Sequence, residues 1–209
     1  MLPEKPGSRL LLWIVLLLPA CFIVWHALAS LLAAPAVYIA GELLQVWLPR
    51  LIEGYSLQGT TMVLTTQYGE TGGKLVPLAE AEFQIGFNQD TRLLSYSIPF
   101  YAALHFASSV DNAMERFGRG LLVLWLLMVV GLVFVSLKNL MVALGDVAFA
   151  EGVLPPPAAI ALLYQFSVLM VPTVAPLCLW AWGSRNSPVI RKLVMAATGG
   201  RDHLPEEEA

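Results

Sequence analysis

The sequence predicts an integral membrane protein that is mainly α-helical, with about four transmembrane helices and a small outward-facing β-hairpin region. Composition is the first reason: 57% of the 209 residues are hydrophobic and 13% are charged, whereas about 25% of the residues in a soluble domain are charged. The mean hydropathy of +0.70 is the second. The third is a set of apolar runs that approach the length of about 20 residues that a helical span needs.

Four apolar segments are the candidate transmembrane helices. They cover residues 10–34, 93–110, 120–137 and 158–182. The segment 93–110 is shorter and more polar than the others, and the sequence leaves open whether it crosses the bilayer completely. The apolar run in 10–34 exceeds the core of about 7–15 residues found in a signal peptide. We therefore expect an uncleaved membrane anchor at the N-terminus.

The distribution of Lys and Arg predicts the orientation. If the N-terminus is cytoplasmic, the segments 1–9, 111–119 and 183–209 lie on the cytoplasmic side and hold eight of the 12 basic residues. The segments on the opposite side hold the other four, in longer stretches. Because cytoplasmic segments of membrane proteins are enriched in Lys and Arg, both termini are expected to be cytoplasmic.

Three segments are expected outside the membrane, on the side opposite the cytoplasm. In residues 35–51, Ile39, Leu43 and Val46 blur a helical pattern in which one face is shared by Val37, Ala40, Leu44, Trp47 and Leu48. This segment is predicted to form an interfacial helix, and a plain extension of the first span is the alternative. Residues 52–92 form the main water-facing region, and residues 138–157 form a shorter segment.

The region 52–92 is predicted to contain a β-hairpin. Residues 79–88 alternate between apolar and polar side chains, residues 60–67 are rich in β-formers, and residues 68–73 have turn composition. There is room for a third short strand near Leu57. Some forty residues cannot bury a core of their own. The apolar face of the hairpin must therefore rest on the bilayer, on the interfacial helix or on a partner.

Polar and ionisable side chains inside the spans are the candidates for chemistry, because burying them in lipid is costly. These intramembrane residues are His26, His105, Tyr164 and Gln165. The two cysteines, Cys21 and Cys178, lie in apolar runs. No nucleophile stands beside a base, no metal-ligand spacing appears and no phosphate-binding loop is present. The sequence therefore predicts no catalytic residue, no cofactor and no metal site.

Three stretches carry a family resemblance. They are LLSYSIPFYAALHFAS at 93–108, LLYQFSVLMVPTVAPLCLWAW at 162–182 and AAPAVYIAGELLQVWLPRLIEG at 33–54, which precedes the β-like stretch. Together they resemble the exosortase H-associated membrane proteins of Gram-negative bacteria. The resemblance implies a multi-pass protein of the bacterial inner (cytoplasmic) membrane that works beside an exosortase. That enzyme is a membrane transpeptidase thought to cleave C-terminal sorting tags from exported proteins.

The resemblance also separates this chain from the enzyme itself. An exosortase is expected to have more spans, with Cys, Arg and His grouped near the outer face. Here Cys21 is predicted in the middle of a span, and Cys178 is predicted toward the cytoplasmic side. We therefore expect a non-catalytic accessory protein for protein sorting, with an exosortase-type transpeptidase and the lipid bilayer as its partners.

The predicted contacts with the enzyme lie in the outer region. They are Phe83, Ile85 and Phe87 of the hairpin and Trp47 of the interfacial helix. The formal net charge of −3 gives no reason to expect nucleic-acid binding. Two alternatives stay open. One is a membrane-embedded enzyme that acts on peptide or lipid substrates through Cys21, His26, His105 or Tyr164, and the other is a small transporter.

Overall fold

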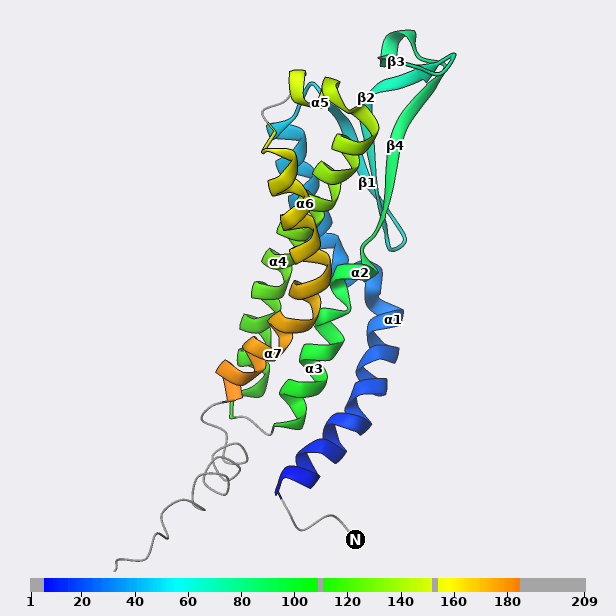
Figure 1. Ribbon diagram of the computed structural model, residues 1–209. Helices are drawn as coiled ribbons and strands as arrows, with labels where there is room; N and C mark the ends of the chain where they lie inside the picture. Colours follow the sequence, from blue (N-terminus) through cyan, green and yellow to red (C-terminus); the bar gives the residue numbers. More distant parts are fainter. Residues whose placement is uncertain (1–5, 109–110, 152–153, 185–209) are drawn as a thin grey trace, which may run out of the picture.

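A bundle of helices stands beside a small antiparallel sheet in the computed structural model, which describes residues 6–108, 111–151 and 154–184 (Figure 1). The elements are, in order, α1 (Pro6–Trp47), β1 (Ile52–Gln58), β2 (Thr61–Thr71), β3 (Lys74–Pro77), β4 (Phe83–Asp90), α2 (Arg92–Ser95), α3 (Ser97–Ala107), α4 (Ala113–Leu144), α5 (Asp146–Glu151), α6 (Pro157–Gln165) and α7 (Val171–Ser184). α1 begins and α7 ends at the same end of the bundle, and the sheet lies toward the opposite end. The predicted combination of mainly helical structure and a small sheet is confirmed.

Three helices in the described ranges are long and apolar enough to cross a membrane. They are Gly7–Trp47, Ala113–Leu144 and the continuous run Pro157–Ser184. These helices coincide with the spans predicted at 10–34, 120–137 and 158–182. α4 has 32 residues, which corresponds to a length of about 48 Å. The hydrocarbon layer is about 30 Å thick, so the bundle extends beyond it.

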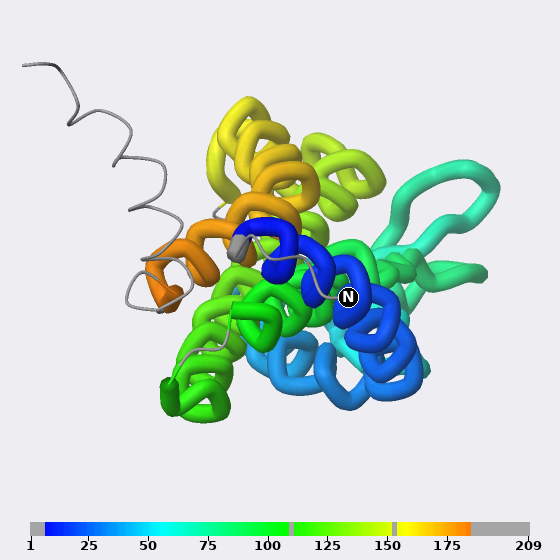
Figure 2. Tube along the Cα trace, turned by 90° about the horizontal axis from the view of Figure 1, so that it is seen from below, coloured from blue at the N-terminus to red at the C-terminus, as the bar shows by residue number. Residues whose placement is uncertain are grey.

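The fourth predicted span, 93–110, is not confirmed. Its described residues form the end of α2 and all of α3, and the helical stretch 92–107 is only about 24 Å long. α3 is packed against α1, α4 and α7 (Figure 2), and nine of its 11 residues are buried. A helix enclosed by protein does not need the apolar surface of a lipid-facing span. This explains why the segment is short and polar, although it returns the chain from the sheet to the end where α1 begins.

The separate interfacial helix predicted at 35–51 is not confirmed either. α1 continues without a break through Pro35 to Trp47, giving 42 residues and a length of about 63 Å. Pro35 removes one backbone hydrogen bond, and the helix absorbs this loss in its interior. The helix ends immediately before Leu48 and Pro49. The upper part of α1 is therefore the plain extension of the first span, which was the alternative interpretation.

The predicted β-region is present, with more strands than a hairpin. β2 is the central strand: β1 pairs with its first half, β3 with its second half, and β4 along both halves, all antiparallel. β1 is the third strand expected near Leu57. The turn at residues 72–73 leads into β3 instead of the long second strand. A 3₁₀ turn at Leu78–Glu80 then delays β4, so that the strand predicted at 79–88 begins at Phe83.

The apolar face of the sheet packs on the helices of the same chain. Tyr55, Leu64 and Phe87 are cross-strand neighbours and belong to, or pack against, the core that α1 and α4 share. α1 and β1 approach so closely that a Cβ atom added at Gly41 would overlap with the ring of Tyr55. The hairpin therefore rests on the chain's own extended helices, and this contact covers most of its apolar face.

The segment predicted as the outer connection at 138–157 is largely helical. α4 continues to Leu144 and ends at Gly145, which has a positive φ of 52°. α5 follows, and Glu151 at its end forms an ion pair with Arg50, with 3.4 Å between the charged atoms. The end of α1 and the connection between α4 and α6 are thus held together at this end of the bundle.

The last span contains a π-helical segment at Phe166–Met170 between α6 and α7. The amide of Val171 donates to the carbonyl of Phe166, five residues earlier. Pro172 follows directly and has no amide hydrogen to donate. The π-helical turn thus lies where Pro172 would interrupt the regular helical hydrogen bonds. The helix then continues through both Pro172 and Pro176 to Ser184.

Candidate functional site

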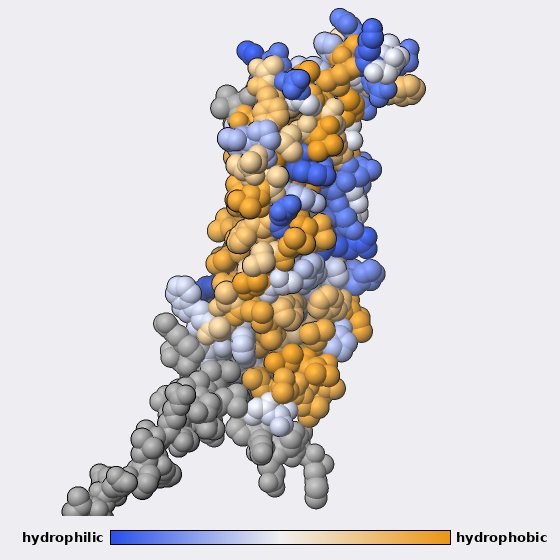
Figure 3. Space-filling view, in the orientation of Figure 1, coloured by the Kyte–Doolittle hydropathy of each residue, from blue (hydrophilic) through white to orange (hydrophobic). Residues whose placement is uncertain are grey.

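The sheet identifies the part of the molecule that lies outside the hydrocarbon of a membrane. One face of it exposes polar side chains, such as Ser56 and Asn88, and among the described strands β4 pairs only with β2. An open strand edge and exposed polar groups are not tolerated in contact with lipid tails. In Figure 3, hydrophilic side chains gather over the sheet while apolar side chains cover the helices below it.

The upper part of α1 lies at the level of this sheet. The Tyr55 hydroxyl donates a hydrogen bond of 2.6 Å to Glu42 Oε1, and Gln45 Nε2 donates one of 3.0 Å to the carbonyl of Glu53. α1 is about twice as long as the hydrocarbon is thick. The last turns of α1 therefore project beyond the lipid tails together with the sheet.

The last turns of α1 expose more apolar surface than an ordinary surface helix. Gln45 and the exposed Glu42 hydrogen-bond to β1, while the side of the helix beside Glu42 carries large apolar side chains. These apolar residues are Ile39, Leu43, Val46 and Trp47, and all four are exposed, Val46 to 77%. We call these four residues the α1 outer stripe. A helix that faces water normally turns its polar side outward, and a contiguous exposed apolar patch marks an interaction surface.

The sequence-predicted partner contacts are not equivalent in the structure. Phe83 is 74% exposed at the start of β4, and Trp47 is exposed at the end of α1. Ile85 and Phe87 are partly buried and pack against the core. Only the first two are therefore available to another protein, while the second pair holds the sheet on the helices.

Among the predicted intramembrane residues, His105 is the most constrained. It is buried in α3, and its Nε2 lies 2.8 Å from the carbonyl oxygen of Ala113, so that this nitrogen carries the proton and donates. Its Nδ1 lies 3.5 Å from the hydroxyl of Tyr101, which also reaches the carbonyl of Arg116 at 3.4 Å. Both ring nitrogens thus have partners that link α3 to the beginning of α4.

The other three intramembrane candidates do not join His105. His26 is exposed on α1, and Gln165 is exposed near the end of α6. Tyr164 lies below Lys138, whose Nζ is 5.5 Å from the centre of its ring. These side chains come from different parts of the bundle and form no cluster with one another among the described residues.

The cysteines and the acidic residues also form no reactive cluster in the described chain. Cys21 is partly exposed on α1, Cys178 is exposed on α7, and both are free thiols. Within the described ranges, no group of three or more His, Cys, Asp or Glu side chains could hold a metal ion. What the bundle does contain is a series of hydrogen bonds between helices.

Indole N–H groups supply three of these hydrogen bonds. Trp125 on α4 donates to the carbonyl of Leu32 on α1 at 2.7 Å, and Trp25 on α1 donates to Ser95 Oγ at 3.3 Å. Trp180 on α7 donates to Ser108 Oγ at 2.6 Å, at the end of α3. Because an indole N–H buried in an apolar bundle needs an acceptor, these pairs fix how the helices face one another.

Polar side chains join the end of the sheet to the bundle. Gln89 is buried at the end of β4, and its amide exchanges hydrogen bonds with Ser136 of α4, at 2.9 and 3.2 Å. One residue later, Asp90 accepts from the Arg92 guanidinium at 2.9–3.1 Å. The hydrogen bonds from Arg92 hold the pKa of the Asp90 carboxyl below its usual value. These contacts fix the junction between β4 and α2.

Sequence reasoning found only Trp47 of the α1 outer stripe and missed the other three residues of this candidate functional surface. Ile39, Leu43 and Val46 are the residues that blurred the helical pattern, and the structure places them on one side of the helix. Val37, Leu44 and Leu48 lie on another side and are buried, as their periodicity indicated. The sequence signal for this surface was a second apolar face on the helix. One apolar face packs in the core, and the other is exposed.

The family comparison agrees with this architecture. The family model described as exosortase H-associated membrane protein matches residues 4–187. The chain belongs to this family. No curated protein and no solved structure matches the chain significantly. The family description and the three apolar helices identify a membrane protein that is associated with exosortase H.

Proposed function

We propose that this protein is a non-catalytic accessory subunit that binds exosortase H through the α1 outer stripe. In this role it supports an enzyme that processes C-terminally tagged exported proteins in the bacterial inner membrane. Both termini lie in the cytoplasm, and the sheet projects from the opposite side of the membrane. The family membership supports the choice of partner, and the four exposed apolar side chains of upper α1 support the choice of surface.

The position of α1 favours a partner that is itself a membrane protein. In the part of α1 that is most apolar, only 6% of the residues are buried within this chain. Exposed apolar residues, such as Ile23 and Leu31, lie below the α1 outer stripe on the same helix. An enzyme with spans and an outer portion can therefore contact α1 within the bilayer and beyond it. Lipid tails, by contrast, can cover only the part of α1 that lies within the bilayer.

A non-catalytic role is supported by the way in which the polar groups are used. His105 is engaged with Tyr101 and Ala113, and the thiols of Cys21 and Cys178 lie on different helices. A nucleophile needs a base within hydrogen-bond reach and a third group that orients the base. The described polar contacts instead link helix to helix and sheet to helix, which is the arrangement of a scaffold.

Co-purification tests the proposal, with Val46→Glu as the decisive substitution. Val46 is 77% exposed, so a carboxylate there leaves the fold intact but must be desolvated in an apolar interface, which is costly. We expect the variant to lower the amount of exosortase H recovered with the tagged protein by about tenfold or more. Quantitative mass spectrometry of the mild-detergent eluate measures this ratio.

Val142→Glu is the matched control. Val142 is 69% exposed on α4, about 1.7 turns beyond Ser136 at the level of the sheet. The substitution makes the same chemical change on another helix. We expect recovery of the enzyme close to that of the wild type. Equal recovery with both variants contradicts docking at the α1 outer stripe. Wild-type protein that is abundant but carries no exosortase H contradicts the accessory role itself and favours the membrane-enzyme alternative.

A further inference from the structure

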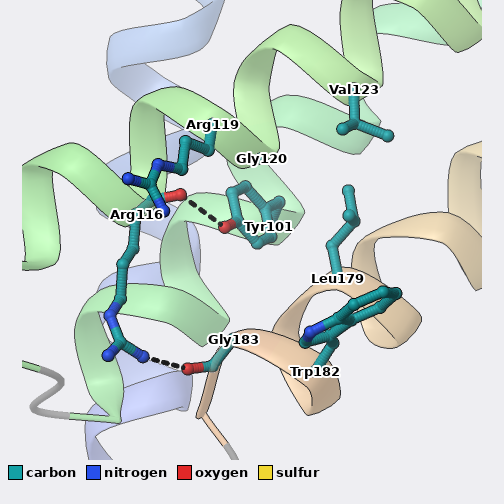
Figure 4. Close-up of a pocket in the computed structure, with 8 residues that line it drawn as sticks. All are labelled: Tyr101, Arg116, Arg119, Gly120, Val123, Leu179, Trp182 and Gly183. Carbon is teal, nitrogen blue, oxygen red and sulfur yellow. Dashed lines mark hydrogen bonds between the residues drawn. The ribbon is translucent and has the colours of Figure 1, made fainter.

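A pocket at the end of the bundle away from the sheet has the composition of an anion site. It has a volume of about 420 Å³ and lies between α4 and α7, with Tyr101 of α3 behind it (Figure 4). Arg116 and Arg119 of α4 lie on one side of it, and Leu179 and Trp182 of α7 lie on the other. The pocket is separate from the α1 outer stripe and does not depend on the proposed partner.

The pocket lies at the boundary between the headgroups and the lipid tails. The apolar part of α4 begins directly after Arg119, and the stretch from 120 to 137 is about 27 Å long, close to the thickness of the hydrocarbon. Its far end reaches the level at which Gln89 of the sheet contacts Ser136. The arginines must therefore lie in the opposite headgroup layer. The exposed indole of Trp182 fits the same layer.

The two guanidinium groups retain capacity for an anion. Arg116 Nη1 donates a hydrogen bond of 2.8 Å to the carbonyl of Gly183, which uses one of its five N–H groups. Among the described ion pairs, Arg116 has no carboxylate partner, and Arg119 pairs with the exposed Glu115. Glu115 does not line the pocket. The polar side of the pocket is therefore cationic.

The remaining walls are apolar. Val123 lies about one turn beyond Arg119 on α4, and Leu179 of α7 faces the pocket from the side opposite the arginines (Figure 4). A molecule that fills the pocket thus meets positive charge at the headgroup level and hydrocarbon at the level of the tails. A free inorganic anion would use only the first of these features, whereas an anionic phospholipid uses both.

We propose that this pocket binds one anionic phospholipid. Arg116 and Arg119 hold the phosphodiester, because a planar guanidinium matches the geometry of phosphate oxygens. The glycerol and the start of the acyl chains lie against Val123, Leu179 and the Trp182 ring. The bound lipid connects α4 to α7 beside the Arg116–Gly183 hydrogen bond and so stabilises this end of the bundle.

Lipid titration of the full-length, delipidated protein in detergent tests the proposal. Native mass spectrometry counts bound lipid, and a thermal shift reports the stabilisation. Phosphatidylglycerol is the probe, with phosphatidylcholine of the same acyl chains and inorganic phosphate in parallel arms. We expect one phosphatidylglycerol to bind and raise Tm, with phosphatidylcholine about tenfold weaker and inorganic phosphate without effect.

Two variants locate the site. Arg119→Ala removes one exposed guanidinium, and Val123→Trp fills the apolar part of the pocket while leaving both arginines in place. Each is expected to weaken phosphatidylglycerol binding by about tenfold. Arg50→Ala removes an exposed arginine near the sheet and should leave binding unchanged. Equal binding of the two lipids, wild-type affinity in both pocket variants, or stabilisation by inorganic phosphate alone would overturn the proposal.

Discussion

At the residue scale, two glycines near the start of α4 differ in what surrounds them. A Cβ atom added at Gly120 would overlap with the hydroxyl of Tyr101, whereas nothing lies within 4 Å of one added at Gly118. Gly120 is thus a point where α3 and α4 pack closely, beside the Tyr101–His105 contact. Gly118 has no such constraint, although it lies in the same helix.

This contrast predicts opposite effects for the same substitution. Gly120→Ala should lower the free energy of unfolding by about 1–3 kcal/mol, because the buried phenol must move in a packed interface. Gly118→Ala should leave it unchanged or raise it by up to about 1 kcal/mol, because alanine favours the helix. Thermal denaturation in detergent compares the two variants. Equal Tm values would contradict the close α3–α4 packing.

At the scale of single elements, β4 combines an exposed aromatic side chain with side chains that pack on the core. Phe83 is 74% exposed, whereas Ile85 and Phe87 are partly buried and pack against the core. A hydrophobic alternation along a strand indicates which side chains share a face. It does not indicate which of these side chains the rest of the chain covers.

A pair of charge substitutions separates these two roles. Ile85→Asp should lower the free energy of unfolding by about 1–3 kcal/mol, because a carboxylate replaces a side chain packed on the core. Phe83→Asp should change it by less than about 0.5 kcal/mol, because the ring is exposed. Thermal denaturation of both variants in detergent measures these changes in stability. A strongly destabilised Phe83→Asp variant would show that this ring has support within the chain.

At the scale of the whole molecule, the two described ends and the sheet lie at opposite ends of the bundle. α1 and α4 carry the chain toward the sheet, and the α6–α7 helix carries it back. α2 and α3 supply the other return within the protein. The described part of the chain therefore begins and ends at the same end of the bundle, although only three of its described helices have the length and composition of a span.

Cysteine labelling measures this topology. In a background with Cys21 and Cys178 replaced by Ala, Gln58→Cys in the sheet should react with a membrane-impermeant maleimide added from the periplasmic side. Met114→Cys, exposed at the start of α4, should react only after the inner membrane is opened. Protection of Gln58→Cys with reaction of Met114→Cys would reverse the proposed orientation. Reaction of both in closed cells would mean that α2 and α3 do not return the chain.

The sequence by itself determined the membrane class, three long apolar helices and a β-rich segment between the first of them and the next. These features depend on composition and local periodicity, which are properties of neighbouring residues. The segment LLSYSIPFYAALHFAS also helped to identify the family, even though it is not a span by length. Its Tyr, Ser and His residues fit a buried helix as well as a short span, and local pattern does not distinguish the two.

Only the tertiary structure decided which surfaces are covered. α3 became a protein-enclosed helix because α1, α4 and α7 surround it, and the apolar face of the sheet is covered because α1 and α4 extend beyond the hydrocarbon. The same extension leaves Ile39, Leu43 and Val46 exposed, while Glu42 and Gln45 hydrogen-bond to β1. Hydrophobicity predicts that a side chain avoids water. Whether the chain itself, lipid or another protein covers it depends on contacts between residues far apart in the sequence.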